Sequence, residues 1–168
     1  MRAATLFATV ALALMLLRPV TALTSQAAPE IAAQMWLNSE PKTLARLKGQ
    51  VVLVEFWTFG CYNCRNVEPH VKQWDERFGP RGLVVIGVHT PETPAEHDVE
   101  NVKRYLRDHG ITYAVATDND FATWNRFDNH AWPAWYLIDK KGIVRYTHVG
   151  EGAYDQTEQE ILQLLAEP

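Results

Sequence analysis

The chain contains two cysteines, Cys61 and Cys64, which are three positions apart in the segment FWTFGCYNC. A Cys-x-x-Cys pair is ambiguous by itself, because it can clip a turn, supply half of a metal site or exchange electrons with other proteins. A disulfide across so short a loop removes little entropy from the unfolded chain, so it would be a poor staple. A zinc site would need two further ligands, and the sequence has no second Cys-x-x-Cys and no closely spaced histidine pair. Redox exchange is therefore the favoured interpretation.

The position of Cys61 favours a reactive thiolate. Residues 50–57 are mostly β-branched and apolar and predict a strand covered on both faces, and a helical pattern of apolar residues follows the cysteines. Cys61 therefore falls at a helix start, where free backbone N–H groups and the helix dipole lower a thiol pKa from about 8.5 to roughly 3.5–7.5. We expect Cys61 to attack a partner disulfide and Cys64, one turn later, to resolve the mixed disulfide.

Two further side chains could support this chemistry. Glu55 lies inside the apolar strand, where loss of hydration would raise its pKa and let it take the proton from Cys64 during resolution. A strand-edge glutamate that points to water is the alternative. His89 ends a second apolar strand and could tune the thiolate as a cation, but a structural loop histidine is the preferred interpretation.

The elements that must position these side chains alternate between strands and helices. We expect strands at 50–57, 82–89, 111–118, 134–139 and 142–150, the last two joined by a DKKG hairpin turn. We expect helices at 43–49, from the cysteines to 78, and at 95–108, 120–127 and 154–166. Residues 23–35 are small and polar, which indicates a flexible lead-in. This order predicts a mainly parallel sheet with helices on both faces and an antiparallel edge.

The composition is that of one globular domain behind a removable head. Of 168 residues, 47% are hydrophobic and 21% are charged, and the net charge of -4 does not favour nucleic-acid binding. The apolar run at 3–17 is short for a bilayer span, which needs about 20 residues, but suits a signal peptide. The small residues that follow allow cleavage after Ala22 or Ala27. We expect a signal peptide at 1–27, with an uncleaved anchor as the alternative, and an extracytoplasmic domain at 28–168.

Several stretches together resemble one known family. They are VVLVEFWTFGCYNC, VVIGVHTPE, ATDNDFATWNRFDNHAWPAWYLID and GEGAYDQTE, and they cover about residues 50–160. They resemble the exported TlpA/ResA-like thiol–disulfide oxidoreductases, and most of all the thioredoxin-like carboxyl-terminal domain of DipZ-type proteins. The resemblance implies a thioredoxin-like α/β fold with a central mixed sheet. One departure is Gly60, because thioredoxin has a tryptophan before its first cysteine, and this puts partner choice in doubt.

The resemblance also implies roles for residues outside the cysteine pair. Glu55 matches the buried acid of thioredoxins. Trp132 and Pro133 match a cis-proline loop beside the cysteines, whose backbone pairs with an incoming peptide. Gly150 matches a glycine near that loop, and Tyr62 and Asn63, between the cysteines, complete the expected substrate-binding set.

The resulting prediction is an exported, monomeric thiol–disulfide oxidoreductase without a cofactor or metal. The resemblance favours the reducing direction, with protein thiols and disulfides as substrates and a membrane electron donor of the DipZ/CcdA type as partner. Two rivals stay open. One is a copper-binding module or metallochaperone that combines the thiols with His89, His130 or His148, and the other is a peroxide reductase on the same fold.

Overall fold

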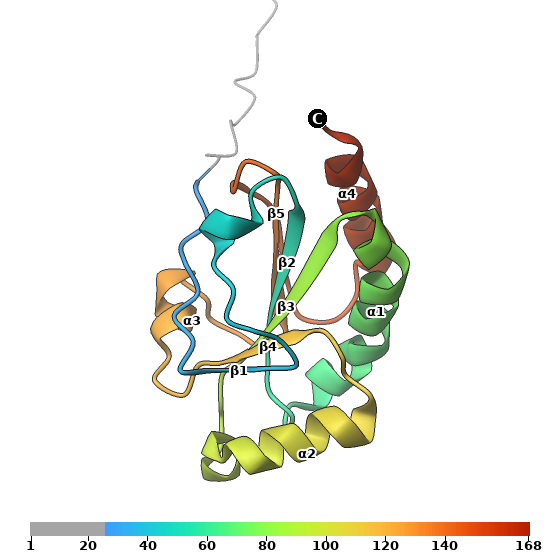
Figure 1. The fold of residues 1–168 in the computed structure, drawn as a ribbon. Coiled ribbons are helices and arrows are strands. Elements are labelled where there is room, and N and C mark those ends of the chain that lie inside the picture. The colour runs from blue at the N-terminus through green and yellow to red at the C-terminus, as the bar shows by residue number, and fades with distance from the viewer. Residues whose placement is uncertain (1–25) are drawn as a thin grey trace, which may run out of the picture.

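The computed structural model of the chain describes residues 26–168, which are coloured in Figure 1. Six strands form its sheet: β1 (Met35–Leu37), β2 (Val51–Trp57), β3 (Leu83–His89), β4 (Ala114–Thr117), β5 (Ala134–Ile138) and β6 (Val144–Val149). Its α-helices are α1 (Tyr62–Phe78), α2 (Val99–His109), α3 (Ala122–Arg126) and α4 (Tyr154–Ala166). Short 3-10 helices lie at Leu44–Leu47 (η1), Gly79–Arg81 (η2) and Pro94–His97 (η3).

The sheet has the order β1-β4-β3-β2-β5-β6 and is mixed. The central pairs β2–β3 and β3–β4 are parallel, whereas β5 is antiparallel to β2, β6 to β5 and β1 to β4. The expectation of a mainly parallel sheet is therefore wrong, because the chain enters β5 from the end of the sheet where β2 finishes. The predicted thioredoxin-like α/β architecture with helices on both faces is confirmed.

Alternation along the strands divides the core into two layers, one on each face of the sheet. On one face, α1, α2 and α4 cover side chains that include Leu53, Trp57 and Leu137. On the other face, α3, η1 and the amino-terminal segment cover a second cluster that includes Val52, Val54, Phe56, Ile86 and Phe127. Figure 1 shows α1 and α4 on one side of the sheet and α3 on the other.

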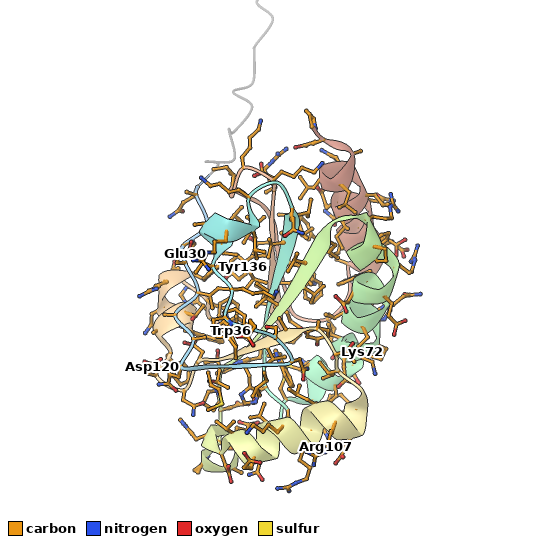
Figure 2. The ribbon with its side chains drawn as sticks, in the orientation of Figure 1. Glu30, Trp36, Lys72, Arg107, Asp120 and Tyr136 are labelled. Carbon is orange, nitrogen blue, oxygen red and sulfur yellow. A yellow bond between two sulfur atoms is a disulfide. The ribbon has the colours of Figure 1, made fainter. Side chains whose placement is uncertain are left out.

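The expected flexible lead-in is wrong for its described part, residues 26–35. Ile31 belongs to the second core cluster, and the Glu30 carboxylate accepts the backbone N–H groups of Leu44 at 2.8 Å and Ala45 at 2.7 Å. Strand β1, which we did not expect, then pairs with β4. Trp36 of β1 and Tyr136 of β5 pack against the same cluster, on the face that α3 covers (Figure 2). A three-residue strand is too short to carry a periodic pattern, so pairing across the sheet alone defines it.

The other expected elements are present, with shifted ends. The helix expected at 95–108 is split into η3 and α2, because Asp98 is extended and its carboxylate accepts the N–H of Glu100 at 2.9 Å as an N-cap. The helix expected at 43–49 is η1. The strand expected at 111–118 is β4, and α4 matches its expected range.

The predicted signal peptide lies almost entirely outside the described residues. Within residues 26–168, no helix combines the length and apolar character needed to cross a membrane.

Candidate active site

Cys61 and Cys64 form a disulfide, with their Cα atoms 5.3 Å apart. Cys61 is the N-cap of α1, and its sulfur accepts the backbone N–H of Cys64 at 3.2 Å. Cys61 is partly exposed, whereas Cys64 is buried with 4% of its surface accessible. The sulfur that precedes the helix is therefore the one open to a partner, and the other lies behind it.

The fold positions Cys61 at the point where β2 ends and α1 begins. The Cys61 N–H donates to the Thr58 carbonyl at 3.3 Å, which closes a turn between the two elements. The first N–H groups of a helix have no partner within the helix, so they surround the Cys61 sulfur with positive dipole. This arrangement stabilises a thiolate at Cys61 when the disulfide is reduced.

Glu55 lies on β2 between Gly87 of β3 and Trp135 of β5. Its side chain is 2% exposed, and alternation along β2 directs it toward the core layer that contains Cys64. Burial raises the Glu55 pKa from 4.5 to about 8, against a weaker lowering by the Tyr113 hydroxyl, which donates to the carboxylate at 3.3 Å. Glu55 is therefore a buried carboxyl group that changes its protonation state close to neutral pH.

His89 is fully buried at the end of β3, between Trp57 and Phe59. Burial lowers its pKa from 6.5 to about 4, so the ring is neutral at neutral pH. Its Nε2 lies 3.2 Å from the Thr58 hydroxyl. The structure thus agrees with the structural role for His89 and contradicts its role as a cation beside the thiolate.

A residue that the sequence reasoning missed, Glu96, contacts the loop before the cysteines. Its side chain is fully buried, and one carboxylate oxygen accepts the Gly60 N–H at 2.7 Å. The Thr93-x-x-Glu96 capping box of η3 was the sequence signal that could have indicated an anchored glutamate. The sequence reasoning included Glu96 only as part of the helix expected at 95–108.

Trp132 and Pro133 lie before β5 and are joined by a cis peptide bond. The Trp132 indole N–H donates to the Thr90 carbonyl at 3.1 Å, and its ring packs against the core layer that Cys61 also contacts. The Gly150 N–H donates to the Pro133 carbonyl at 2.8 Å, and Gly150 has a φ of +87° that favours glycine. These three expected site residues therefore lie together around one loop.

Tyr62 and Asn63 occupy the exposed first turn of α1, between the two cysteines. Tyr62 is 71% exposed, which is unusual for a large aromatic side chain. The three histidines considered for copper are dispersed: His89 is buried, His130 is on the loop after α3, and His148 packs on Trp135. Among residues 26–168, no group of three or more His, Cys, Asp or Glu side chains could hold a metal ion.

The chain is similar in sequence to known proteins over most of its length. Residues 24–147 match the AhpC/TSA family. Protein DipZ of Mycobacterium tuberculosis (strain CDC 1551 / Oshkosh) is 46% identical over 133 residues, which are 77% of this chain but only 19% of that protein. Thiol-disulfide oxidoreductase YkuV of Bacillus subtilis (strain 168) is 29% identical over 143 residues, 84% of this chain and 96% of YkuV.

Solved structures show the same fold over most of the chain. A thioredoxin-like protein in the oxidized form has a TM-score of 0.77 at 29% identity, with 84% of this chain and 96% of that chain covered. A thiol-disulfide isomerase from Corynebacterium glutamicum has a TM-score of 0.75 at 25% identity, with 84% and 98% covered. These findings show that the chain, with its Cys61–Cys64 disulfide at the start of α1, has a thioredoxin-like fold and belongs to the AhpC/TSA family.

Proposed function

We propose that this protein is exported and that its dithiol reduces disulfides in client proteins. The observation that supports this best is the asymmetry of the disulfide: Cys61 is partly exposed at a helix start, while Cys64 is buried in the core layer toward which Glu55 points. An exposed attacking sulfur and a shielded resolving sulfur are what two-step disulfide exchange requires.

The proposed reaction has two displacements. The Cys61 thiolate attacks one sulfur of the client disulfide, which forms a mixed disulfide and releases the other client sulfur as a thiolate. Cys64 loses its proton to the Glu55 carboxylate and then attacks the Cys61 sulfur. The Cys61–Cys64 disulfide forms, and the second client sulfur leaves and is protonated. Two electrons pass from the protein to the client in one cycle.

Client binding is assigned to the loop around Pro133 and to the exposed first turn of α1. The proposal gives Trp132, Pro133 and Gly150 a role in holding the client backbone, and Tyr62 and Asn63 a role in contacting its side chains. Its support is that Trp132 packs against the same core layer as Cys61, while Tyr62 is highly exposed. Exposed aromatic groups are common at the centre of protein contacts.

Export and the electron source are the further parts of the proposal. The apolar run at 3–17 supports a signal peptide. Cleavage after Ala22 fits better than cleavage after Ala27, because the Val144 N–H donates to the Gln26 carbonyl and the later cut would remove this acceptor. The similarity to one part of DipZ supports a membrane donor of the DipZ/CcdA type, which would return the disulfide to the dithiol.

The test is the equilibrium reduction potential of the Cys61–Cys64 pair against glutathione, with reduction of a protein disulfide as the activity. We expect a value near that of thioredoxin, about -270 mV. A value near that of the oxidant DsbA, about -120 mV, would contradict the reducing role. Titration with Cu(I) and a peroxide-consumption assay on the same preparation separate the two rival functions, and tight copper binding or rapid peroxide turnover without protein reduction would reject the proposal.

A further inference from the structure

The buried Glu96 carboxylate is hydrogen-bonded to the active-site loop, and the proposed reaction does not use it. It accepts the N–H groups of Gly60, Glu92 and Thr93, each at 2.7 Å. The Gly60 bond joins segments 36 residues apart, so the carboxylate ties the loop between β2 and α1 to the start of η3. In Figure 1 both α1 and α2 begin at this lower end of the sheet.

This contact accounts for the glycine before Cys61. A Cβ atom added at Gly60 would collide with the Glu96 carboxylate. The carboxylate is fully buried and held by several N–H groups, so it has little freedom to move aside. The departure from the tryptophan of thioredoxin is therefore matched by a buried acid that occupies the adjacent space.

The carboxylate also carries a charge beside Cys61. Burial alone would raise its pKa, but hydrogen bonds from the Thr58 hydroxyl and from the N–H groups of Glu92, Thr93 and Gly60 hold the Glu96 pKa below its usual value. No ion pair within residues 26–168 includes Glu96. The neighbouring His89 is neutral. A fixed negative charge without a cation is thus hydrogen-bonded to the residue directly before Cys61.

We propose that Glu96 is a positioning residue that fixes the loop before Cys61 and shifts the Cys61–Cys64 pair toward its disulfide form, which makes the dithiol a stronger reductant. The inference rests on the proposed function, and it assigns to Glu96 part of the reason why electrons pass from the dithiol to the client. The disulfide is uncharged, whereas reduction with two electrons creates a thiolate at Cys61, so a nearby anion disfavours the reduced form. A Cys-x-x-Cys protein whose dithiol form is stabilised acts as an oxidant, and one whose dithiol form is destabilised acts as a reductant.

The test compares Glu96→Gln with the matched control Glu92→Gln. Both remove one negative charge from the same loop, but the Glu92 side chain is exposed and accepts no hydrogen bond from the active-site loop. We expect Glu96→Gln to shift the equilibrium with glutathione toward the dithiol by at least tenfold, about 30 mV, and to lower the Cys61 thiol pKa, read from thiolate absorbance. Glu92→Gln should change the equilibrium less than twofold. Equal equilibria for the two variants would overturn the inference.

A second variant covers the case in which Glu96→Gln does not fold. Gly60→Ala keeps the charges of Glu92 and Glu96, but its added Cβ displaces the Glu96 carboxylate from the loop. We expect it to shift the equilibrium with glutathione toward the dithiol by at least threefold. If folded Gly60→Ala has the equilibrium of the unmodified protein, the inference fails. The two failures are distinguishable, because the proposed function is tested by the potential of the unmodified protein and this inference only by the difference between variants.

Discussion

Cys61 and Cys64 differ in exposure, and this difference assigns them to different steps of the exchange. Cys61→Ser removes the exposed attacking sulfur, so we expect no protein-disulfide reduction. Cys64→Ser leaves the attack intact and removes resolution, so mixed disulfides with clients should accumulate. Mass spectrometry after acid quenching under non-reducing conditions detects them. Full activity of Cys61→Ser, or adducts that form equally well with Cys61→Ser, would contradict the assignment.

Glu55 makes the stability of the protein depend on pH. Because its pKa rises from 4.5 to about 8 on folding, the folded state holds the proton more tightly than the unfolded state. This contribution to stability is complete below pH 4.5 and is lost as pH rises through 8, with a slope of about 1.4 kcal/mol per pH unit between the two values. We expect the free energy of unfolding of Glu55→Gln to depend less on pH than that of the unmodified protein. Urea unfolding of the oxidised proteins from pH 5 to 9 measures this dependence.

The same substitution should slow the chemistry. Glu55→Gln cannot accept the Cys64 proton, so we expect turnover to fall by about 100-fold or more at neutral pH. Glu76→Gln, at an exposed position of α1, is the control and should alter neither the pH profile nor turnover. If Glu55→Gln retains the stability profile of the unmodified protein, Glu55 does not have a raised pKa.

At the scale of the elements, Asp118 connects β4 to α3. Its carboxylate is fully buried and accepts the N–H groups of Thr123 at 2.8 Å and Trp124 at 2.9 Å, which have no partner within the helix. The Thr90 hydroxyl also donates to it, at 3.2 Å. Asp118 thus fixes α3. The ring centroid of Trp124 in this helix lies 4.3 Å from that of Trp132 in the proposed client-binding loop.

We expect Asp118→Ala to lower the free energy of unfolding by about 1–3 kcal/mol, because buried N–H groups lose their acceptor. Urea unfolding measures this loss, and tryptophan fluorescence should change because Trp124 and Trp132 lose their fixed contact. Asp118→Asn keeps one acceptor oxygen and should cost less. An equal cost for the two substitutions would mean that packing, not hydrogen bonding, is responsible.

At the scale of the whole molecule, the amino-terminal segment joins opposite edges of the sheet. Ala27 bridges to Ile143 at the β5–β6 hairpin, Ile31 enters the second core layer, and β1 pairs with β4 at the far edge. The blue segment in Figure 1 follows this course beside α3. The segment therefore covers apolar side chains that would otherwise face water.

A chain that begins at residue 38 should be less stable than one that begins at residue 23, by about 3 kcal/mol or more, because it loses a core isoleucine and a paired strand. Urea unfolding of the two chains measures the difference. A chain that begins at residue 28 loses only the Ala27 bridge and the hydrogen bond from Val144 to Gln26, so its free energy of unfolding should be close to that of the longer chain. Equal stability for the chains from 23 and 38 would show that the segment contributes nothing to the fold.

The elements around the cysteines could be predicted because their patterns are local. Residues 51–57 are apolar except for Glu55, and α1 and α4 repeat apolar residues at helical spacing, so these elements can be recognised from the order of residues alone. The same holds for Cys61, since its position between a strand and a helix is a property of neighbouring residues. The sequence by itself thus determined the alternation of elements and the position of the cysteine pair at a helix start, whereas the burial of Glu55 was decided only by the folded sheet.

Only the tertiary structure decided the contacts between segments far apart in the chain. The antiparallel direction of β5, the pairing of β1 and the bond between Glu96 and Gly60 each depend on residues that no local pattern relates. The charge state of His89 depends on how completely other elements remove it from water. Backbone pairing, burial and electrostatic fields act through space, so their outcome at the active site became determined only when the whole chain had folded.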